Sequence, residues 1–192
     1  MTVYLTIGFP GSGKSTWSRK FAQENENVVI INRDAFRTMI KDTYTFNFRY
    51  EPFIKNSTNR TIEQALEQGL NVIVDETHVK AARRIEIVET IRRFENSYGL
   101  INTDYGKTKI VYMWFTENQN NLHFRMQESR GYDAHKWEEV IHGMKSIFEP
   151  PTKKEGFDEL VKINPLENLN GRLQQSDRSD TTKRRRIRKQ PK

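Results

Sequence analysis

Hydrophobic residues along the chain follow two alternating patterns. Short runs rich in valine and isoleucine predict strands, and stretches with apolar residues every three or four positions predict helices. We predict strands at residues 3–7, 28–31, 71–75, 109–115 and 157–163. We predict helices at residues 15–23, 34–40, 53–69, 81–94, 118–128 and 136–148. This repeated order predicts an α/β fold, with a parallel sheet of about five strands and helices on both faces.

The chain length limits how many domains this pattern can build. Its 192 residues, 35% of them hydrophobic, suffice for one α/β core and leave little for a second. We therefore expect one domain at residues 1–165. Residues 166–192 have almost nothing to bury, so we expect a disordered tail. No secretory signal and no stretch of roughly 18 apolar residues occurs, which favours the cytoplasm, or the nucleus of a eukaryotic cell, over a membrane.

Charge and cysteine content exclude several classes of protein. The chain has 32 basic and 25 acidic residues, a net charge of +7, and seven of the basic residues lie in the last ten positions. The remaining 25 basic residues equal the 25 acidic ones, so the body is neutral and a histone-like coating protein is excluded. The absence of cysteine excludes disulfides, thiolate zinc sites and a cysteine nucleophile.

A phosphate-binding motif follows the first predicted strand and opens the first predicted helix. Residues 8–15 read Gly-Phe-Pro-Gly-Ser-Gly-Lys-Ser and match G-x-x-x-x-G-K-[ST]. Glycines let backbone N–H groups wrap around a phosphate at a helix N-terminus. Lys14 would bind the β and γ phosphates of ATP, and Ser15 would bind Mg²⁺. The predicted nucleotide-binding residues here are Gly8, Pro10, Gly11, Ser12, Gly13, Lys14, Ser15 and Thr16.

Candidate acceptor residues follow the second predicted strand, at the sheet edge where ligands bind in open parallel sheets. Asp34 could accept a proton from an attacking hydroxyl, and Arg37, one helical turn later, could hold an anionic group of the acceptor. The alternative is that Asp34 only caps the short helix and Arg37 is solvated.

Further candidates follow the third and fourth strands. Asp75 could reach Mg²⁺ and Thr77 could donate to a phosphate, although an acidic residue at a strand end is also an ordinary cap. Arg125 and Arg130 lie in a polar stretch suited to a lid that places cations over the nucleotide, with a solvated helix face as the alternative. The four histidines show no metal-binding spacing and are interpreted as surface or packing residues: His78, His123, His135 and His142.

Taken in order, these motifs resemble one known family. The chain reads Ile-Asn-Arg-Asp-Ala-Phe-Arg at residues 31–37, Asp-Glu-Thr-His at 75–78, Arg-Gly at 130–131 and Phe-Glu-Pro-Pro-Thr-Lys-Lys-Glu-Gly-Phe-Asp-Glu at 148–159. With the phosphate motif, this order is similar to the polynucleotide 5′-hydroxyl kinases, from residue 2 to about 165. The resemblance implies an adenylate-kinase-like P-loop fold and transfer of the ATP γ-phosphate to the 5′-OH of DNA or RNA.

The resemblance also implies roles for single residues. Lys14 and Ser15 match the family's phosphate and Mg²⁺ residues, Asp34 its general base, and Arg37 the residue that binds the acceptor's 3′-phosphate. Arg130 resembles the lid arginine. Thr77 falls on a threonine of the acceptor side, whereas His78 replaces a usual asparagine. The phosphatase motif Asp-x-Asp-Gly-Thr of the bifunctional relatives does not occur, so we expect a kinase without 3′-phosphatase activity, with a separate ligase or phosphatase as its natural partner.

Two other functions fit the same phosphate motif. A P-loop kinase for a small molecule, such as a nucleoside, a sugar or a nucleotide-sugar, would keep the roles of Lys14, Ser15 and Asp34 but has no use for a basic arm. A non-catalytic, ATP-dependent scaffold would bind nucleic acid without transferring phosphate.

Two features bear on a nucleic-acid acceptor. The basic cluster at residues 183–192 would raise affinity through counterion release, although such tails also serve as localisation signals. Aromatic residues at every second position, Tyr44, Phe46, Phe48 and Tyr50, could stack exposed bases. At that spacing they could equally be one face of a strand or loop, and we favour packing on the core.

Overall fold

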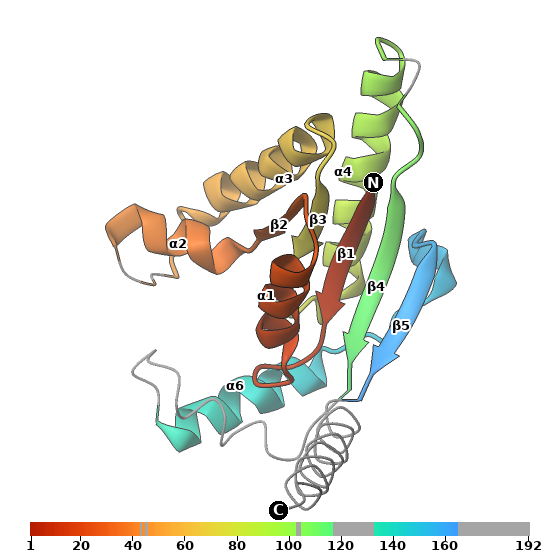
Figure 1. Ribbon diagram of the computed structural model, residues 1–192. Helices are drawn as coiled ribbons and strands as arrows, with labels where there is room; N and C mark the ends of the chain where they lie inside the picture. Colours follow the sequence, from red (N-terminus) through yellow and green to blue (C-terminus); the bar gives the residue numbers. More distant parts are fainter. Residues whose placement is uncertain (43, 45, 103–104, 117–132, 165–192) are drawn as a thin grey trace, which may run out of the picture.

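Five parallel strands form the centre of the molecule. The computed structural model describes residues 1–42, 44, 46–102, 105–116 and 133–164. The strands are β1 (Thr2–Ile7), β2 (Val28–Ile31), β3 (Asn71–Val74), β4 (Lys109–Phe115) and β5 (Glu159–Ile163). They lie in the order β2-β3-β1-β4-β5, and each neighbouring pair is parallel (Figure 1). The predicted α/β fold with a five-stranded parallel sheet is confirmed.

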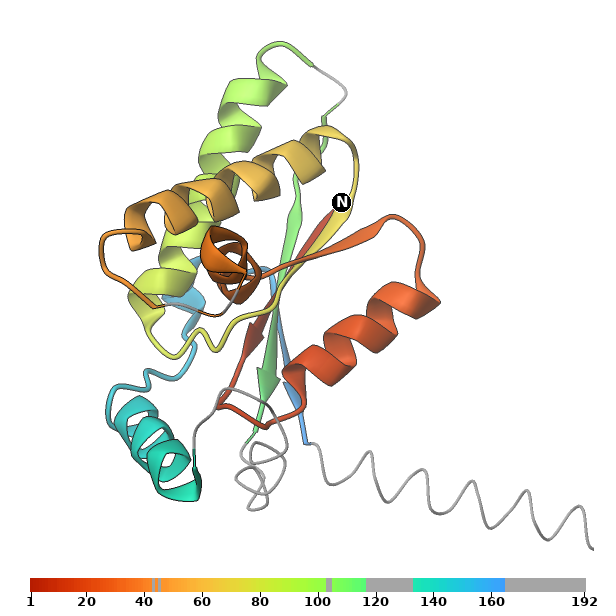
Figure 2. The same cartoon turned by 90° about the vertical axis from the view of Figure 1, so that its left-hand side faces the viewer.

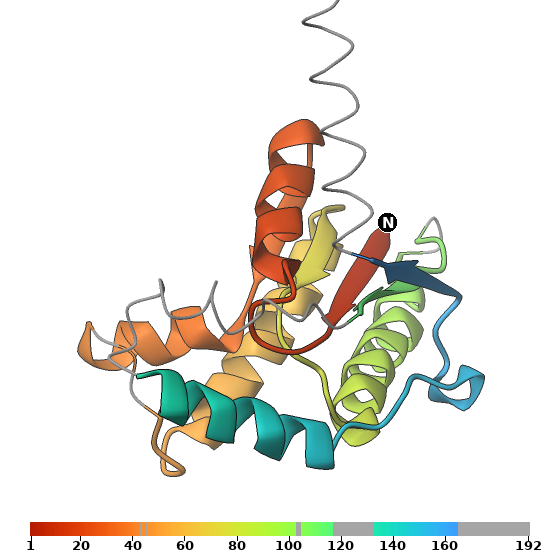
Figure 3. The same cartoon turned by 90° about the horizontal axis from the view of Figure 1, so that it is seen from below.

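Helices cover both faces of the sheet. They are α1 (Lys14–Glu24), α2 (Arg33–Lys41), α3 (Glu51–Glu67), α4 (Ala81–Gly99), α6 (Ala134–Ser146) and the 3₁₀ turn η1 (Lys153–Glu155). Helix α1 lies on one face and α3 and α4 on the other (Figure 2). Helix α6 lies at the end of the molecule where β1 and β4 have their carboxyl ends (Figure 1; seen from below in Figure 3). No helix within the described residues is long and apolar enough to cross a bilayer.

The main core lies between the sheet and helices α3 and α4. Alternate residues of each strand point to opposite faces, so Val3 and Leu5 of β1 face these helices, and both are fully buried. Ile62 of α3 and Ile87 of α4 pack in the same cluster. Burying one such side chain stabilises the folded state by about 1.5–3 kcal/mol. The packed layer therefore fixes the strands whose carboxyl ends carry the site.

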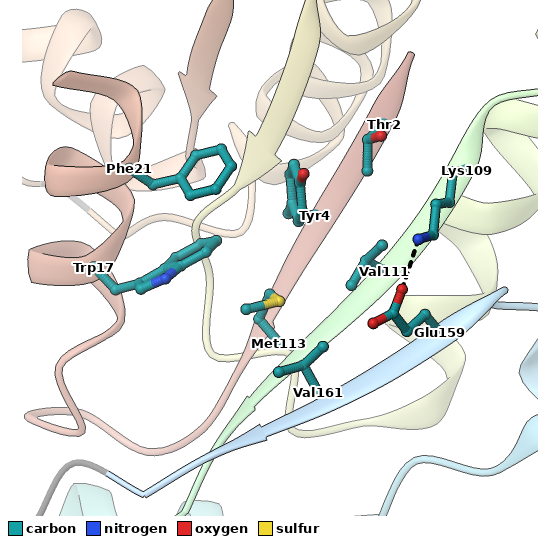
Figure 4. Close-up of a pocket in the computed structure, with 9 residues that line it drawn as sticks. All are labelled: Thr2, Tyr4, Trp17, Phe21, Lys109, Val111, Met113, Glu159 and Val161. Atoms are coloured by element: carbon teal, nitrogen blue, oxygen red, sulfur yellow. Dashed lines mark ion pairs between the residues drawn. The ribbon is translucent and has the colours of Figure 1, made fainter. Parts of the chain in front are cut away.

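A smaller apolar layer lies under helix α1 on the other face. Tyr4 of β1 and Trp17 of α1 have ring centroids 6.0 Å apart, and Trp17 also packs on Phe115 of β4. A cavity of about 290 Å³ opens beside them, rimmed by the Lys109–Glu159 ion pair (Figure 4). Its rim holds the first residues of β1, β4 and β5, whereas ligands of open parallel sheets bind at the carboxyl ends. We therefore expect the substrate site at the carboxyl ends and not in this cavity.

The boundaries of most elements differ from the sequence prediction, and the differences at α4 and β5 have a structural cause. Helix α4 continues to Gly99 instead of ending at residue 94. The extra turn is held by Phe94 and Tyr98, whose rings stack at 5.2 Å, and by Glu95, which accepts from the backbone N–H of Thr108. Strand β5 begins at residue 159 instead of 157, because Phe157 turns inward to pack on Tyr112. The helix predicted at residues 118–128 lies outside the described residues.

The preference for core packing of the aromatic segment is wrong for two of its four residues. Phe46 and Phe48 have 53% and 82% of their surface exposed, whereas Tyr44 and Tyr50 are half-buried. These residues lie in the connection between α2 and α3, not in a strand. The two-residue spacing therefore does not produce a single buried face.

A buried ion pair fastens α4 to the segment that follows α6. Arg84, fully buried, donates from Nε and Nη2 to the two carboxylate oxygens of Glu155 at 2.7 and 2.8 Å. The same guanidinium donates to the carbonyl oxygens of His78 and Glu149 at 2.8 and 2.9 Å. The sequence predicts an amphipathic helix here, and its pattern does not single out Arg84 as the buried arginine. This residue joins three segments next to the candidate site.

Candidate functional site

The three predicted site segments meet at one edge of the sheet. β2, β3 and β1 are neighbours, so their carboxyl ends lie side by side, with the phosphate loop after β1 and α2 after β2 (Figure 3). Two backbone hydrogen bonds join these ends: Gly8 donates to the Thr77 carbonyl at 3.0 Å, and Asp75 donates to the Ile31 carbonyl at 2.9 Å. The edge therefore presents phosphate-binding and acidic groups in one place.

The loop between β1 and α1 has the backbone that a phosphate cradle requires. Gly8, Gly11 and Gly13 have φ angles of 149°, 77° and 91°, which L side chains rarely adopt. A Cβ on Gly8 would lie 2.8 Å from the Phe115 carbonyl oxygen, so only glycine fits there. Gly13 caps α1 and has no side chain to bond its first N–H groups. A helix N-terminus of this kind favours an anion, so the loop fits a phosphate.

The side chains of the loop also fit a bound phosphate. Lys14 is 6% exposed, and its Nζ donates to the Phe9 carbonyl at 2.7 Å and to Ser12 Oγ at 3.3 Å. Its ammonium therefore sits inside the loop, where a phosphate would offer it stronger acceptors. Ser15 and Thr16 are exposed in the first turn of α1. Their hydroxyls are accessible to a ligand held by the loop.

Asp34 and Arg37 are joined on the first turns of α2. Arg37 Nη1 donates to Asp34 Oδ1 at 2.7 Å. The helix is capped by Asn32, whose side chain accepts from the Ala35 N–H at 2.7 Å, so Asp34 is not the cap. The Asp34 side chain is 43% exposed and is therefore accessible from solvent.

Glu51, in the first turn of α3, orients Arg37 from the other side. Arg37 donates from Nε and Nη2 to the two oxygens of Glu51 at 2.9 and 2.7 Å. Burial by itself lowers the pKa of Arg37, but the hydrogen bonds to Glu51 and Asp34 outweigh it and raise that pKa. Arg37 is thus held by two carboxylates and is not solvated.

The third strand end supplies Asp75 and Thr77. Thr6 Oγ1 donates to Asp75 Oδ1 at 3.3 Å and to the Glu76 carbonyl at 2.9 Å. Within the described residues, no group of three or more His, Asp and Glu side chains could hold a metal alone. A Mg²⁺ at Ser15 and Asp75 would therefore need phosphate and water oxygens as its other ligands, which is its usual preference.

A second charged cluster lies beside this edge. Glu76 is 3.1 Å from Arg83 Nη2, 3.5 Å from Arg33 Nε and 3.8 Å from His78 Nε2. Burial alone raises the pKa of the Glu76 carboxyl, but His78, Arg83 and Arg33 outweigh it and lower that pKa. The cluster thus ties the start of α2 to the start of α4 across the β3 end.

Sequence reasoning missed Glu51 and Glu76 as partners of the site arginines. Arg37 and Glu51 are 14 residues apart, and no local pattern relates them. Glu76 lies inside the Asp-Glu-Thr-His motif, which was a signal that this strand end belongs to the site. Only the fold shows that Arg33 and Arg83 contact it. The predicted lid residues Arg125 and Arg130 lie outside the described residues, so their positions stay predictions.

His78 is buried in the segment between β3 and α4, with a φ of 44°. Its Nδ1 donates to the Thr6 carbonyl oxygen at 2.6 Å. Burial lowers the pKa of His78 to about 4, although the Glu76 carboxylate opposes that change. His78 is therefore neutral at neutral pH, which agrees with its interpretation as a packing residue.

We expect His78 to make the fold less stable in mild acid. Below about pH 6.5 the unfolded chain protonates this histidine, whereas the folded chain does so only near pH 4. The free energy of unfolding should fall across that window, by as much as about 3 kcal/mol from this residue. His78→Asn should flatten the pH dependence of the free energy of unfolding, and asparagine tolerates the positive φ at this position. Urea unfolding at pH 7, 5.5 and 4.5 measures this dependence. His142→Asn, at an exposed position of α6, is the control, and equal slopes in both variants would contradict the assignment.

The chain is similar in sequence to known proteins. The family model described as an AAA domain matches residues 3–151. The L-seryl-tRNA(Sec) kinase of Methanococcus maripaludis is 30% identical over 162 residues, which cover 82% of this chain and 56% of the relative. The chain therefore spans about half the length of that curated relative.

Solved structures share the fold. A fungal RNA kinase matches with a TM-score of 0.63 at 15% identity, over 84% of this chain and 74% of that one. A chain of the Pnkp1/Rnl/Hen1 RNA repair complex matches with a TM-score of 0.54 at 24% identity, over 82% of this chain and 46% of that one. These likenesses, with the parallel sheet and the phosphate loop, identify the P-loop kinase fold. The chain belongs to the AAA domain family.

Proposed function

We propose that this chain is a kinase that transfers the γ-phosphate of ATP to the 5′-hydroxyl end of DNA or RNA. The observation that carries the proposal is the Asp34–Arg37 pair, joined at 2.7 Å at the carboxyl end of β2. A carboxylate accepts a hydroxyl proton, and a guanidinium fork binds a phosphate. A terminal nucleotide with a 3′-phosphate presents both groups a few bonds apart, which suits this arrangement.

The residues at the sheet edge can carry out each step of the proposed transfer. The 5′ oxygen forms a bond to the γ-phosphorus, the bond from that phosphorus to the bridging oxygen of ADP breaks, and Asp34 takes the hydroxyl proton. Lys14 stabilises negative charge on the transferring group, and the loop N–H groups hold the other phosphates. Mg²⁺, held by Ser15 and Asp75, would neutralise phosphate charge. Arg125 and Arg130 are proposed to add cations from the lid.

Arg37 should decide which acceptors react well. Arg37→Ala removes the phosphate-binding fork, so KM for a 3′-nucleotide should rise by about 10- to 100-fold, as for a lost charged hydrogen bond. A nucleoside without the 3′-phosphate should be phosphorylated as well by the variant as by the wild type. Steady-state kinetics with both acceptors measure the difference. An equal loss on both acceptors would show that Arg37 only supports the fold.

Seryl-tRNA is a second candidate acceptor, because one relative of this chain is an L-seryl-tRNA(Sec) kinase. A serine hydroxyl on a tRNA would use Asp34 as base in the same way. The deciding experiment supplies γ-labelled ATP with 5′-OH DNA and RNA oligonucleotides, nucleosides, 3′-nucleotides and seryl-tRNA. Label at the 5′ ends of oligonucleotides supports our proposal. Label only on seryl-tRNA, or only on nucleosides, refutes it in favour of that acceptor.

The basic cluster at residues 183–192 is proposed to hold the acceptor strand. It lies outside the described residues, and its support is its charge alone. Deleting these ten residues should weaken oligonucleotide binding and flatten its salt dependence, by about 0.7 in the log–log slope for each lost phosphate contact. Turnover at saturating acceptor should stay nearly unchanged. Fluorescence titrations at several salt concentrations measure the slope, and an unaltered slope would end this idea.

A further inference from the structure

Two exposed aromatic residues beside the candidate site form a pair. Phe46 and Phe48, here called the aromatic platform, have ring centroids 5.0 Å apart in a T-shaped arrangement. They keep 53% and 82% of their surface exposed. Leaving two such side chains in water gives up apolar burial worth several kcal/mol. Exposed aromatic groups that gather in this way indicate a binding surface.

The aromatic platform is connected to the proposed acceptor residues. The Arg37 guanidinium carbon lies 5.6 Å from the Phe46 ring centroid, in cation–π geometry. The same guanidinium donates to Asp34 at 2.7 Å. One arginine side chain therefore bridges the proposed base to Phe46, and Phe46 contacts Phe48. Arg37, Phe46 and Phe48 therefore form a continuous series of contacts that begins at Asp34.

Two exposed cations near the platform favour a nucleic acid over an apolar partner. Lys41 and Arg49 are exposed on either side of it along the chain, and the exposed Asp42 follows Lys41. Cations beside aromatic rings bind single strands because phosphates contact the cations and bases stack on the rings. A lipid or an apolar protein surface would not explain why the platform begins at the arginine proposed to hold the acceptor phosphate.

We propose that Phe46 and Phe48 stack unpaired bases of the acceptor strand, on the 3′ side of the nucleotide that is phosphorylated. This inference rests on the proposed function. The terminal phosphate occupies Arg37, and the strand continues outward over Phe46 and Phe48. Stacking tolerates any base, so the platform adds affinity for a single-stranded end without reading its sequence. A 3′-mononucleotide reaches Arg37 but not the platform.

The test compares acceptors of different length with variants of the platform. Phe48→Ala should raise KM for a 5′-OH oligonucleotide by about 5- to 150-fold, the loss expected from one stacked base. The KM increase should be absent with a 3′-mononucleotide. Phe48→Tyr should retain the low KM, because it keeps an aromatic face. Phe53→Ala is the matched control, since Phe53 is also an exposed phenylalanine, with 62% of its surface accessible.

An abasic acceptor separates stacking from other losses. The wild-type chain should bind an oligonucleotide with abasic second and third nucleotides as weakly as the double variant Phe46→Ala with Phe48→Ala binds the intact one. The double variant should lose little more on the abasic acceptor. Equal KM values for intact and abasic acceptors would overturn the inference while oligonucleotide phosphorylation stands. A dimer of the wild type that Phe48→Ala dissociates, with KM unchanged, would instead assign the platform to a second copy. Absence of label on every oligonucleotide refutes the proposed function itself.

Discussion

Replacing Asp34 with asparagine should lower the rate of phosphate transfer to a 5′-OH oligonucleotide by about 10²- to 10⁴-fold. Asparagine keeps the size of the side chain but cannot take the hydroxyl proton. The phosphate loop lies between β1 and α1, and Asp34 lies on α2, so ATP affinity should be preserved. Single-turnover label transfer gives the rate, and calorimetric titration with a non-hydrolysable ATP analogue gives the affinity.

Asp34 also accepts a hydrogen bond from Arg37. Asp34→Asn therefore changes both the proposed base and the contact with Arg37. Glu51→Gln is the matched control because it weakens the hold on Arg37 and keeps the proposed base. We expect Glu51→Gln to raise KM for phosphate-bearing acceptors and to leave most of the rate. If Asp34→Asn lost only as much rate as Glu51→Gln, Asp34 would be a partner of Arg37 and not the base.

Replacing Glu155 with alanine should lower the free energy of unfolding by about 3–5 kcal/mol, the usual cost of removing one partner of a buried ion pair. Arg84 would keep its charge in a fully buried place. Its bonds to the carbonyls of His78 and Glu149 would remain, but they cannot neutralise it. Urea unfolding measures this loss of stability.

Two variants make the Glu155 result specific. Glu24→Ala removes an exposed ion pair with Lys20 and should change stability little. The double variant Arg84→Met with Glu155→Met should regain part of the loss, because no unpaired charge is left. It should not regain all of it, since the carbonyls of His78 and Glu149 lose their donor. A Glu155→Ala variant as stable as Glu24→Ala would contradict the importance of the buried pair.

The strands and the phosphate loop were predictable because their signals are local. A strand such as β1 shows its alternation within six residues, and the glycines at positions 8, 11 and 13 are required by their own backbone angles. Asp34 and Thr77 were predictable as edge residues because parallel strands bring their carboxyl ends together. The end of α4 was not predictable, because Tyr98 packs on both Phe94 and Tyr105. Tyr105 lies beyond the helix, so no local pattern shows this contact.

The sequence by itself determined the α/β order of elements, the phosphate loop and the acidic and basic residues at the strand ends. Only the tertiary structure decided which charges meet. Arg37 is 14 residues from Glu51, and Arg84 is 71 residues from Glu155. It also decided that Phe46 and Phe48 face solvent, because alternation shows that residues share a face but not whether another element covers it. Hydrophobic periodicity acts over a few residues, whereas burial and ion pairing depend on segments that the folded chain brings together.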